Sequence, residues 1–431
     1  MWDTVFSRNN LFKALKRVEQ NKGAPGSDGM TTNELRPYLR VHWKEIKESL
    51  DKGIYQPKPL RRKDIPKPNG GTRQLGIPTV LDRFIQQAIA QGLTPVFEPQ
   101  FSPLSFGYRP NKRAHMAIET AKQNIQEGFE YVVDIDLEKF FDRVNHDMLM
   151  ARVARIVKDK KLLFLIRKYL SSGIMQNGVI ITTPEGTPQG GPLSPLLANI
   201  MLDDLDHELE KRRHPFVRYA DDMTIFVKSE RAGERVLANT KRYIETKLRL
   251  KVNDKKTAVR KAWQTKILGF SFYWYKGVVR IRIAKQALQK CKARIRKLTR
   301  RTRHGLILEI VKETNVYLTG WIGYFQLADT NSVLRDLDGW VRHRLRQIVW
   351  KRWKRGKTRF ANLVELGIPK EEASIGVRGT SPWHMANVSI VKFALDNAYW
   401  EEQGLRSVLT CANSLRKVYR TAVCGPARPV V

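Results

Sequence analysis

Two adjacent carboxylates in a short turn constrain this chain more than any other feature. Asp221 and Asp222 lie between two apolar, strand-like runs, residues 216–218 and 223–227, a pattern that predicts a β-hairpin with paired acids at its tip. Carboxylates about 4 Å apart repel by roughly 4 kcal/mol at an effective dielectric near 20, so such a pair usually binds a divalent cation. Hard oxygen ligands favour Mg²⁺. A solvated turn is the common alternative for an isolated Asp-Asp pair.

A third carboxylate earlier in the chain favours the metal over the solvated turn. Residues 132–137 alternate apolar and acidic side chains, so Asp134 and Asp136 project from one face of a predicted strand. We select Asp136, beside the Phe140-Phe141 pair, as the ligand and expect Asp134 to face solvent or to be structurally paired. Three carboxylates on two strands can hold two metal ions about 3.5–4 Å apart, one activating a primer 3′-hydroxyl and one neutralising the leaving pyrophosphate. Asp136, Asp221 and Asp222 are therefore the predicted catalytic and metal-binding residues of a polymerase.

Further motifs resemble those of bacterial group II intron reverse transcriptases. In chain order they are Gly23-Ala24-Pro25-Gly26-Ser27-Asp28-Gly29, residues 65–70 and 73–78, Ser105-Phe106-Gly107-Tyr108-Arg109-Pro110, residues 187–199, Lys251-Val252-Asn253 with Lys256-Thr257, and Leu268-Gly269-Phe270. The resemblance runs from about residue 10 to about residue 408. Within the family it is closest to the compact group IIC type that lacks an endonuclease, to which the thermostable Geobacillus enzymes belong.

The resemblance implies an α+β fold, a right-hand polymerase whose fingers and palm contain an antiparallel sheet. The fingers and palm, with an N-terminal extension, would occupy residues 1–285. A helical thumb, the maturase domain X, would follow at residues 286–360, and a small basic DNA-binding region with a tail at residues 361–431. From the residues themselves we expect a fingers hairpin between residues 60–65 and 72–77, a helix capped by Asn10, and a disordered tail over residues 411–431.

The resemblance also implies a set of nucleotide-contacting residues. These are Lys67 and Arg73 as a clamp on the triphosphate, Gln189 and Gly190 beside the nucleotide, Phe141 beneath the incoming sugar, and Lys256 as an acid near the leaving pyrophosphate. From pattern alone, two basic residues on a hairpin are more often a solvated face, and Phe140 and Phe141 could both be core residues.

The implied function is that of a nucleotidyltransferase. It would be an RNA-directed DNA polymerase that uses two Mg²⁺ ions, with Mn²⁺ as a substitute, and extends a DNA primer on an RNA template with dNTPs. As a maturase it would also bind the intron RNA for splicing and for retrohoming into a DNA target. The alternatives are a domesticated reverse transcriptase in defence or repair, and an RNA-binding splicing factor without polymerase activity. The intact aspartates argue against the latter.

The charge of the chain agrees with a polyanionic partner. It carries 78 Lys and Arg against 42 Asp and Glu, a net charge of +36, which is typical of nucleic-acid binding. Residues 286–360 alone hold 19 basic and 5 acidic side chains, and there we expect Arg342, Arg344, Arg346, Lys351 and Arg352 to contact RNA or duplex. The sequence lacks an apolar run of about 18 residues and a signal-peptide pattern, so we expect a bacterial cytoplasmic protein without a membrane partner.

Overall fold

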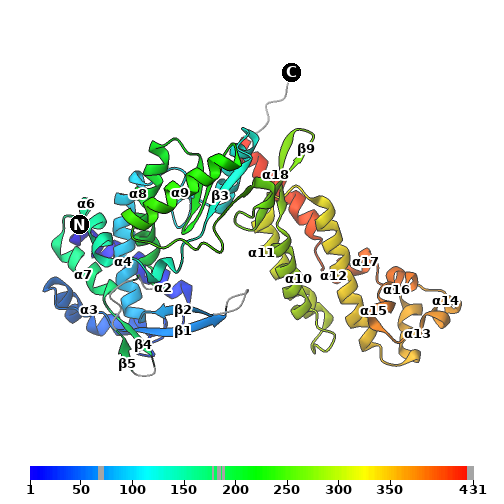
Figure 1. Cartoon of the computed structure of the whole chain (residues 1–431). Coiled ribbons are helices and arrows are strands. Elements are labelled where there is room, and N and C mark those ends of the chain that lie inside the picture. Colours follow the sequence, from blue (N-terminus) through cyan, green and yellow to red (C-terminus); the bar gives the residue numbers. More distant parts are fainter. Residues whose placement is uncertain (67–71, 177–178, 182–185, 187–189, 425–431) are drawn as a thin grey trace, which may run out of the picture. The chain divides into compact units, whose positions relative to one another are not determined.

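A computed structural model describes residues 1–66, 72–176, 179–181, 186 and 190–424 (Figure 1). The chain divides into two compact units, Met1–Thr265 and Lys266–Val431. The β-hairpin that follows Lys266 belongs to the second unit, whereas the division into fingers and palm, thumb and DNA-binding region is a functional one and stays a prediction. No helix among the described residues is long and apolar enough to cross a membrane.

An antiparallel sheet of four strands, in the order β6-β7-β3-β8, lies at the centre of the first unit. Its strands are β3 (Tyr131–Ile135), β6 (Phe216–Tyr219), β7 (Asp222–Val227) and β8 (Ala258–Lys261). Strand β3 pairs with β7 on one side and β8 on the other. β-Branched and aromatic side chains such as Val133, Ile225 and Phe226 are fully buried in it, which is the environment such residues favour. The predicted hairpin of β6 and β7 is confirmed.

A second sheet has the strand order β2-β1-β4-β5. Strands β1 (Leu60–Pro66) and β2 (Thr72–Ile77) form the expected antiparallel hairpin, with Ile65 opposite Arg73. The turn between them, with Lys67, lies outside the described residues. Strands β4 (Ile174–Gln176) and β5 (Val179–Ile181) extend the sheet, and β4 runs parallel to β1.

Nine α-helices of the described first unit surround these sheets. They are α1 (Trp2–Val5), α2 (Arg8–Asn21), α3 (Leu35–Asp51), α4 (Val80–Phe97), α5 (Ala114–Gln126), α6 (His146–Ile156), α7 (Lys160–Leu170), α8 (Ser194–Lys211) and α9 (Glu230–Lys247). The cap predicted at Asn10 is wrong, because Ser7 caps α2 and accepts a hydrogen bond from the Asn10 amide. The Asn10 side chain instead donates to the carbonyls of Val5 and Ala88 and so ties α2 to α4.

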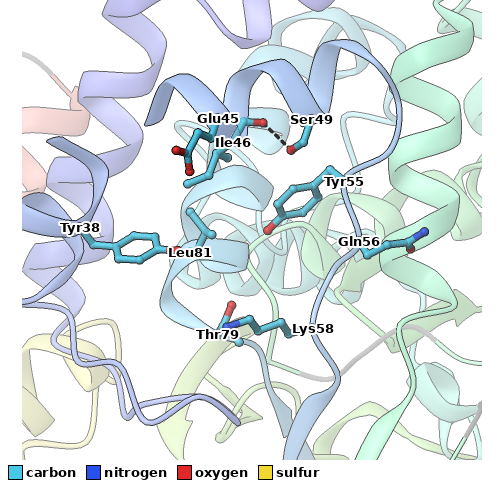
Figure 2. Close-up of a pocket in the computed structure, with 9 residues that line it drawn as sticks. All are labelled: Tyr38, Glu45, Ile46, Ser49, Tyr55, Gln56, Lys58, Thr79 and Leu81. Carbon is cyan, nitrogen blue, oxygen red and sulfur yellow. Dashed lines mark hydrogen bonds between the residues drawn. The ribbon is translucent and has the colours of Figure 1, made fainter. Parts of the chain in front are cut away.

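A buried carboxylate fixes the start of α4. Asp82 accepts hydrogen bonds from the Thr79 and Tyr55 hydroxyls at 2.7 and 2.8 Å and from the Lys58 amide at 3.1 Å. Burial raises the pKa of this carboxyl above its usual range. Figure 2 shows the adjacent pocket of about 290 Å³, which α3, the segment from Tyr55 to Lys58 and the first residues of α4 enclose. The network joins the segment that precedes β1 to the start of α4.

The second unit consists of a hairpin followed by helices. The hairpin is β9 (Phe270–Tyr275) with β10 (Val278–Ile283), and the helices are α10 (Lys285–Leu298), α11 (Ile307–Phe325), α12 (Asn331–Arg352), α13 (Gly356–Glu365), α14 (Lys370–Gly376), α15 (Pro382–Met385), α16 (Ser389–Ala394), α17 (Asn397–Glu402) and α18 (Val408–Cys424). The helical content expected after residue 286 is therefore present.

The prediction that residues 411–431 form a disordered tail is wrong as far as Cys424, where α18 ends. Asp338, on α12, holds the start of this helix by accepting hydrogen bonds from the Ser407 hydroxyl and from the Val408 amide, both at 2.7 Å. Arg416 donates to the Gln326 carbonyl at 3.0 Å. The first turn of a helix needs acceptors for its free amides, and here a carboxylate far away in the sequence supplies them.

Candidate active site

The predicted acids lie at one end of the central sheet. Tyr219 pairs with Asp222 across the β6-β7 turn, and Ile135 of β3 pairs with Met223 of β7. Continued by one residue, the β3-β7 register sets Asp136 opposite Asp222, and opposed residues of antiparallel strands have Cα atoms about 4.5–5.5 Å apart. Asp221 belongs to the turn itself. Sequence spacing and strand register thus agree on a single acidic edge.

The loop after α9 holds Asp136 in place. The Asp136 amide donates to the Thr257 hydroxyl at 3.1 Å, and its carbonyl accepts from the Asn253 amide at 2.8 Å. The carboxylate accepts from the Asn253 side chain and from the Lys256 ammonium, each at 3.0 Å. Lys256, predicted as an acid near the pyrophosphate, therefore contacts a predicted catalytic residue directly.

The donor chemistry of this edge suits a divalent cation, since carboxylate oxygens are the ligands that Mg²⁺ prefers. The three acids nevertheless do not form a ligand cluster: the described part of the chain contains no group of three or more His, Cys, Asp or Glu side chains arranged to hold a metal ion. In this structure Lys256 provides the positive charge beside Asp136. The metal assignment therefore stays a prediction, supported by the kind of donor and by its position.

A buried ion pair that sequence reasoning missed lies next to the acidic turn. Arg218 and Asp206 are both fully buried, and the Arg218 Nη2 atom lies 2.5 Å from the Asp206 carboxylate. The Arg218 Nη1 atom also donates to the Ala220 carbonyl, inside the turn, and to the Asn199 side chain, each at 2.9 Å. The sequence predicts Arg218 as part of a strand, and it lies in β6. Its side chain also connects α8 to the acidic turn.

The motif of residues 105–110 needs a glycine at position 107, because the chain passes close to the acidic turn there. A Cβ atom at this position would collide with the Ala220 amide nitrogen, and the Gly107 carbonyl accepts a hydrogen bond from the Asn199 side chain at 2.9 Å. Ala220 has φ +60°, a left-handed conformation that costs a residue with a Cβ about 1 kcal/mol. The segment at Gly107 and the ion pair thus hold a strained turn from two sides.

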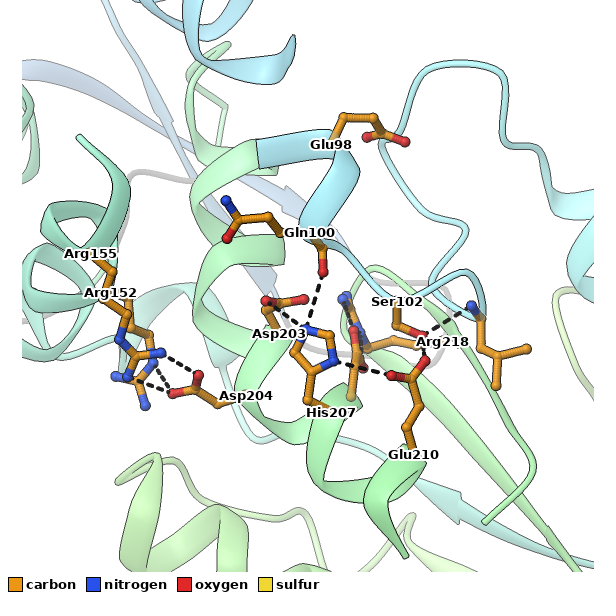
Figure 3. Close-up of polar contacts among 12 residues, drawn as sticks. Glu98, Gln100, Ser102, Arg152, Arg155, Asp203, Asp204, His207, Glu210 and Arg218 are labelled. Atoms are coloured by element: carbon orange, nitrogen blue, oxygen red, sulfur yellow. Dashed lines mark hydrogen bonds and ion pairs between the residues drawn. The ribbon is translucent and has the colours of Figure 1, made fainter. Parts of the chain in front are cut away.

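Other polar side chains of α8 anchor neighbouring segments, as Figure 3 shows. His207 lies between the Gln100 carbonyl and the Glu210 carboxylate, 3.1 Å from each. Burial works to lower the pKa of His207, but Glu210 and Asp203 outweigh it and raise that pKa. Burial also raises the pKa of Asp203 to about 6. Asp204 pairs with Arg152 and Arg155 of α6. We assign these groups to the support of the fold.

The structure describes some of the predicted nucleotide-contacting residues. Phe141 is 8% exposed and packs edge-on against Phe140, with ring centroids 5.1 Å apart. Gly190 has φ +132°, and a Cβ there would lie 2.8 Å from the Gly76 carbonyl of β2, so the loop that contains Gly190 closely approaches the hairpin that carries Arg73. Lys67 and Gln189 lie outside the described residues. The nucleotide roles of all these residues stay predictions.

Comparison with known proteins identifies the family of the chain. The chain matches the family model for reverse transcriptase (RNA-dependent DNA polymerase) over residues 65–272 and the model for the group II intron, maturase-specific domain over residues 288–367. It is 33% identical over 289 residues to Protein YkfC of Escherichia coli (strain K12), with 58% of this chain and 76% of that protein covered. It is 37% identical over 213 residues to the group II intron-encoded protein LtrA of Lactococcus lactis subsp. cremoris.

The fold and the matches define the class as a right-hand polymerase of the reverse transcriptase type, an RNA-directed DNA polymerase. The chain belongs to the family of group II intron reverse transcriptases with a maturase domain. The match to LtrA covers 47% of this chain and only 35% of LtrA. A solved chain of a partial Cas6-RT-Cas1--Cas2 complex is 29% identical, with 57% of this chain and 42% of that chain covered and a TM-score of 0.37.

Proposed function

We propose that this protein copies RNA into DNA at the acidic edge of its central sheet and that it binds a group II intron RNA as a maturase. The observation that carries the proposal is the position of Asp136, Asp221 and Asp222 at one end of adjacent strands. The two family matches on one chain support the combination of both roles. The compact group IIC type, retrohoming into DNA and a bacterial cytoplasmic location belong to the proposal and rest on the motif resemblance.

In this proposal Asp136, Asp221 and Asp222 hold the divalent ions, which when bound would activate the primer 3′-hydroxyl and neutralise the leaving pyrophosphate. Lys256 contacts Asp136 and is largely exposed, so its ammonium could donate a proton to the pyrophosphate as it leaves. Arg218 and Gly107 keep the turn in its strained conformation. The protein thus supplies ligands, a proton donor and a rigid support.

A splicing assay distinguishes the maturase role from the alternative, a domesticated reverse transcriptase. RNA transcribed from the gene, together with its flanking sequence, is incubated with and without the protein, and ligated exons are measured. We expect the protein to accelerate splicing, and the Asp222→Asn variant to do so equally, because RNA binding needs phosphate contacts rather than the catalytic acids. A flanking RNA that never splices would favour a domesticated reverse transcriptase in defence or repair.

Phe141 gives a separate test of the proposed nucleotide pocket. If its ring lies beneath the incoming sugar, a 2′-hydroxyl would clash with it, so the site would discriminate by repulsion. Phe141→Ala should then raise ribonucleotide relative to deoxyribonucleotide incorporation by about one to three decades, equivalent to about 1.4–4 kcal/mol. Single-nucleotide extension with each substrate measures the ratio.

Phe140→Ala is the matched control, since Phe140 packs against Phe141 and is 2% exposed. We expect it to reduce stability without changing the ratio. A shift confined to Phe140→Ala would mean that Phe140, and not Phe141, faces the sugar. If neither variant changes the ratio, the 2′-hydroxyl is rejected elsewhere.

A further inference from the structure

A strongly basic pocket lies in the second unit. Its volume is about 490 Å³, and it is lined by Arg300, Arg301, Thr302, Arg344, Lys351 and Pro382. The turn after α10, one side of α12 and the first residue of α15 line this open pocket. Four of the six lining residues are cationic and none is acidic.

Hydrogen bonds within the protein hold Arg344 beside the turn that carries the other two arginines. Arg344 donates to the Thr299 carbonyl at 2.7 Å and to the Thr299 hydroxyl at 3.2 Å, and Thr299 is fully buried. This contact fixes the turn that carries Arg300 and Arg301 against α12. Lys351 follows Arg344 by two helical turns and therefore lies on the same side of α12.

The pocket has an uncompensated positive charge. Within the part of the chain that the structure describes, no ion pair joins Arg300, Arg301, Arg344 or Lys351 to a carboxylate. Burial, followed by the charges of Arg301 and Arg296, lowers the pKa of the Arg344 guanidinium. Like charges brought together without an anion repel one another. A bound anion would relieve this repulsion.

A neighbouring arginine, Arg346, has its guanidinium buried and hydrogen-bonded within the protein. Arg346 is 7% exposed and donates to the Ala386 and Leu395 carbonyls at 3.0 and 3.3 Å. The prediction that Arg346 contacts RNA is therefore wrong, because its guanidinium is used inside the protein. Arg344 and Lys351, from the same predicted set, do line the pocket.

An exposed aromatic residue adjoins the pocket. Trp383 directly follows Pro382 and is 60% exposed, and its ring lies edge-on to the His343 ring with centroids 6.1 Å apart. Exposed aromatic side chains stack on unpaired bases in proteins that bind single-stranded nucleic acid. Duplex bases are already stacked on one another and cannot use it.

We propose that this pocket binds a backbone phosphate of single-stranded RNA, such as a loop of the intron RNA, while the adjoining base stacks on Trp383. Several guanidinium donors without an acid match a phosphate. The assignment to RNA rests on the proposed maturase function. Arg300 to Lys351 lie inside the maturase match, and Pro382 and Trp383 lie beyond it.

The test measures the affinity of the full-length protein for a labelled RNA hairpin with a single-stranded loop over a series of salt concentrations. Trp383→Ala should weaken binding about 5- to 150-fold, which corresponds to about 1–3 kcal/mol for one stacked base, with an unchanged salt slope. Trp383→Phe should retain most of the affinity. Arg301→Ala with Lys351→Ala should flatten the slope of log affinity against log salt by about 0.7, the value for one single-strand phosphate.

Lys357→Ala with Lys370→Ala removes the same charge from exposed positions outside the pocket and is the matched control. Ultraviolet cross-linking of a loop containing 4-thiouridine should modify the peptide with Trp383. The pocket assignment would be overturned if the pocket variants bind RNA as the control does. It would also be overturned if they lose as much affinity for duplex DNA as for RNA. Wild-type protein that fails to bind any intron RNA would overturn the proposed maturase function instead.

Discussion

Primer extension should be lost in Asp222→Asn. The change removes one carboxylate from the acidic edge, and we expect the rate to fall by at least about 10³-fold, equivalent to about 4 kcal/mol of transition-state stabilisation. The substitution keeps the size of the side chain, and Asp222 is exposed at the strand end, so the fold should be unaffected. RNA affinity should change little, because few phosphate contacts are lost. Extension of a DNA primer on an RNA template, with filter binding in parallel, measures both quantities.

Asp134→Asn is the control for this result. Asp134 lies on the neighbouring strand β3 and pairs with Thr224 and Ala258 inside the sheet, so we expect activity within a few fold of the wild type. Equal losses in both variants would show that the loss is not specific to the acids at the sheet edge. Continued extension by Asp222→Asn would contradict the assignment of the acidic edge.

The second large effect concerns the ion pair beside the turn. Asp206→Ala leaves the fully buried Arg218 without its counter-charge, and breaking a buried pair in this way costs about 3–5 kcal/mol. We expect the urea midpoint of the first unfolding transition to fall accordingly. Because Arg218 also holds the Ala220 carbonyl, kcat should fall at temperatures where the variant is still folded, with a smaller change in KM.

Glu208→Ala on the same helix provides the comparison. Glu208 pairs with Arg212 at the surface, and exposed pairs contribute about 0–1 kcal/mol. Asp206→Leu combined with Arg218→Met should recover much of the stability, since apolar replacement of a buried pair is often tolerated, but not the activity. If the double variant extends primers like the wild type, the ion pair does not position the turn.

Local patterns were enough to predict much of this fold. The alternation around Asp136, the hairpin with Asp221 and Asp222, and the hairpin of β1 and β2 all follow from side-chain periodicity and turn residues, which depend on near neighbours. Failures came where the partner is distant in sequence. The Asn10 side chain donates a hydrogen bond to the Ala88 carbonyl, and Arg346 donates one to the Leu395 carbonyl. Asp338 accepts a hydrogen bond from the first amide of α18.

The candidate site shows the same division. Its acids could be found from motif and spacing, because their chemistry requires those residue types. The support could not be found, since Arg218 in a strand looks the same whether its side chain points to solvent or to Asp206. Only the packing of α8 against β6 decides between the two. The same holds for Phe141, whose burial beside Phe140 says nothing about the sugar it would exclude.

The most direct measurement is RNA-templated synthesis by the purified full-length protein. A DNA primer annealed to an RNA template is incubated with dNTPs and either Mg²⁺ or Mn²⁺, and the products are sequenced. We predict cDNA that copies the template, that requires the divalent ion and that disappears in Asp222→Asn. Protein that binds the primed RNA but incorporates no nucleotide with either metal ion would contradict the account and favour an RNA-binding splicing factor.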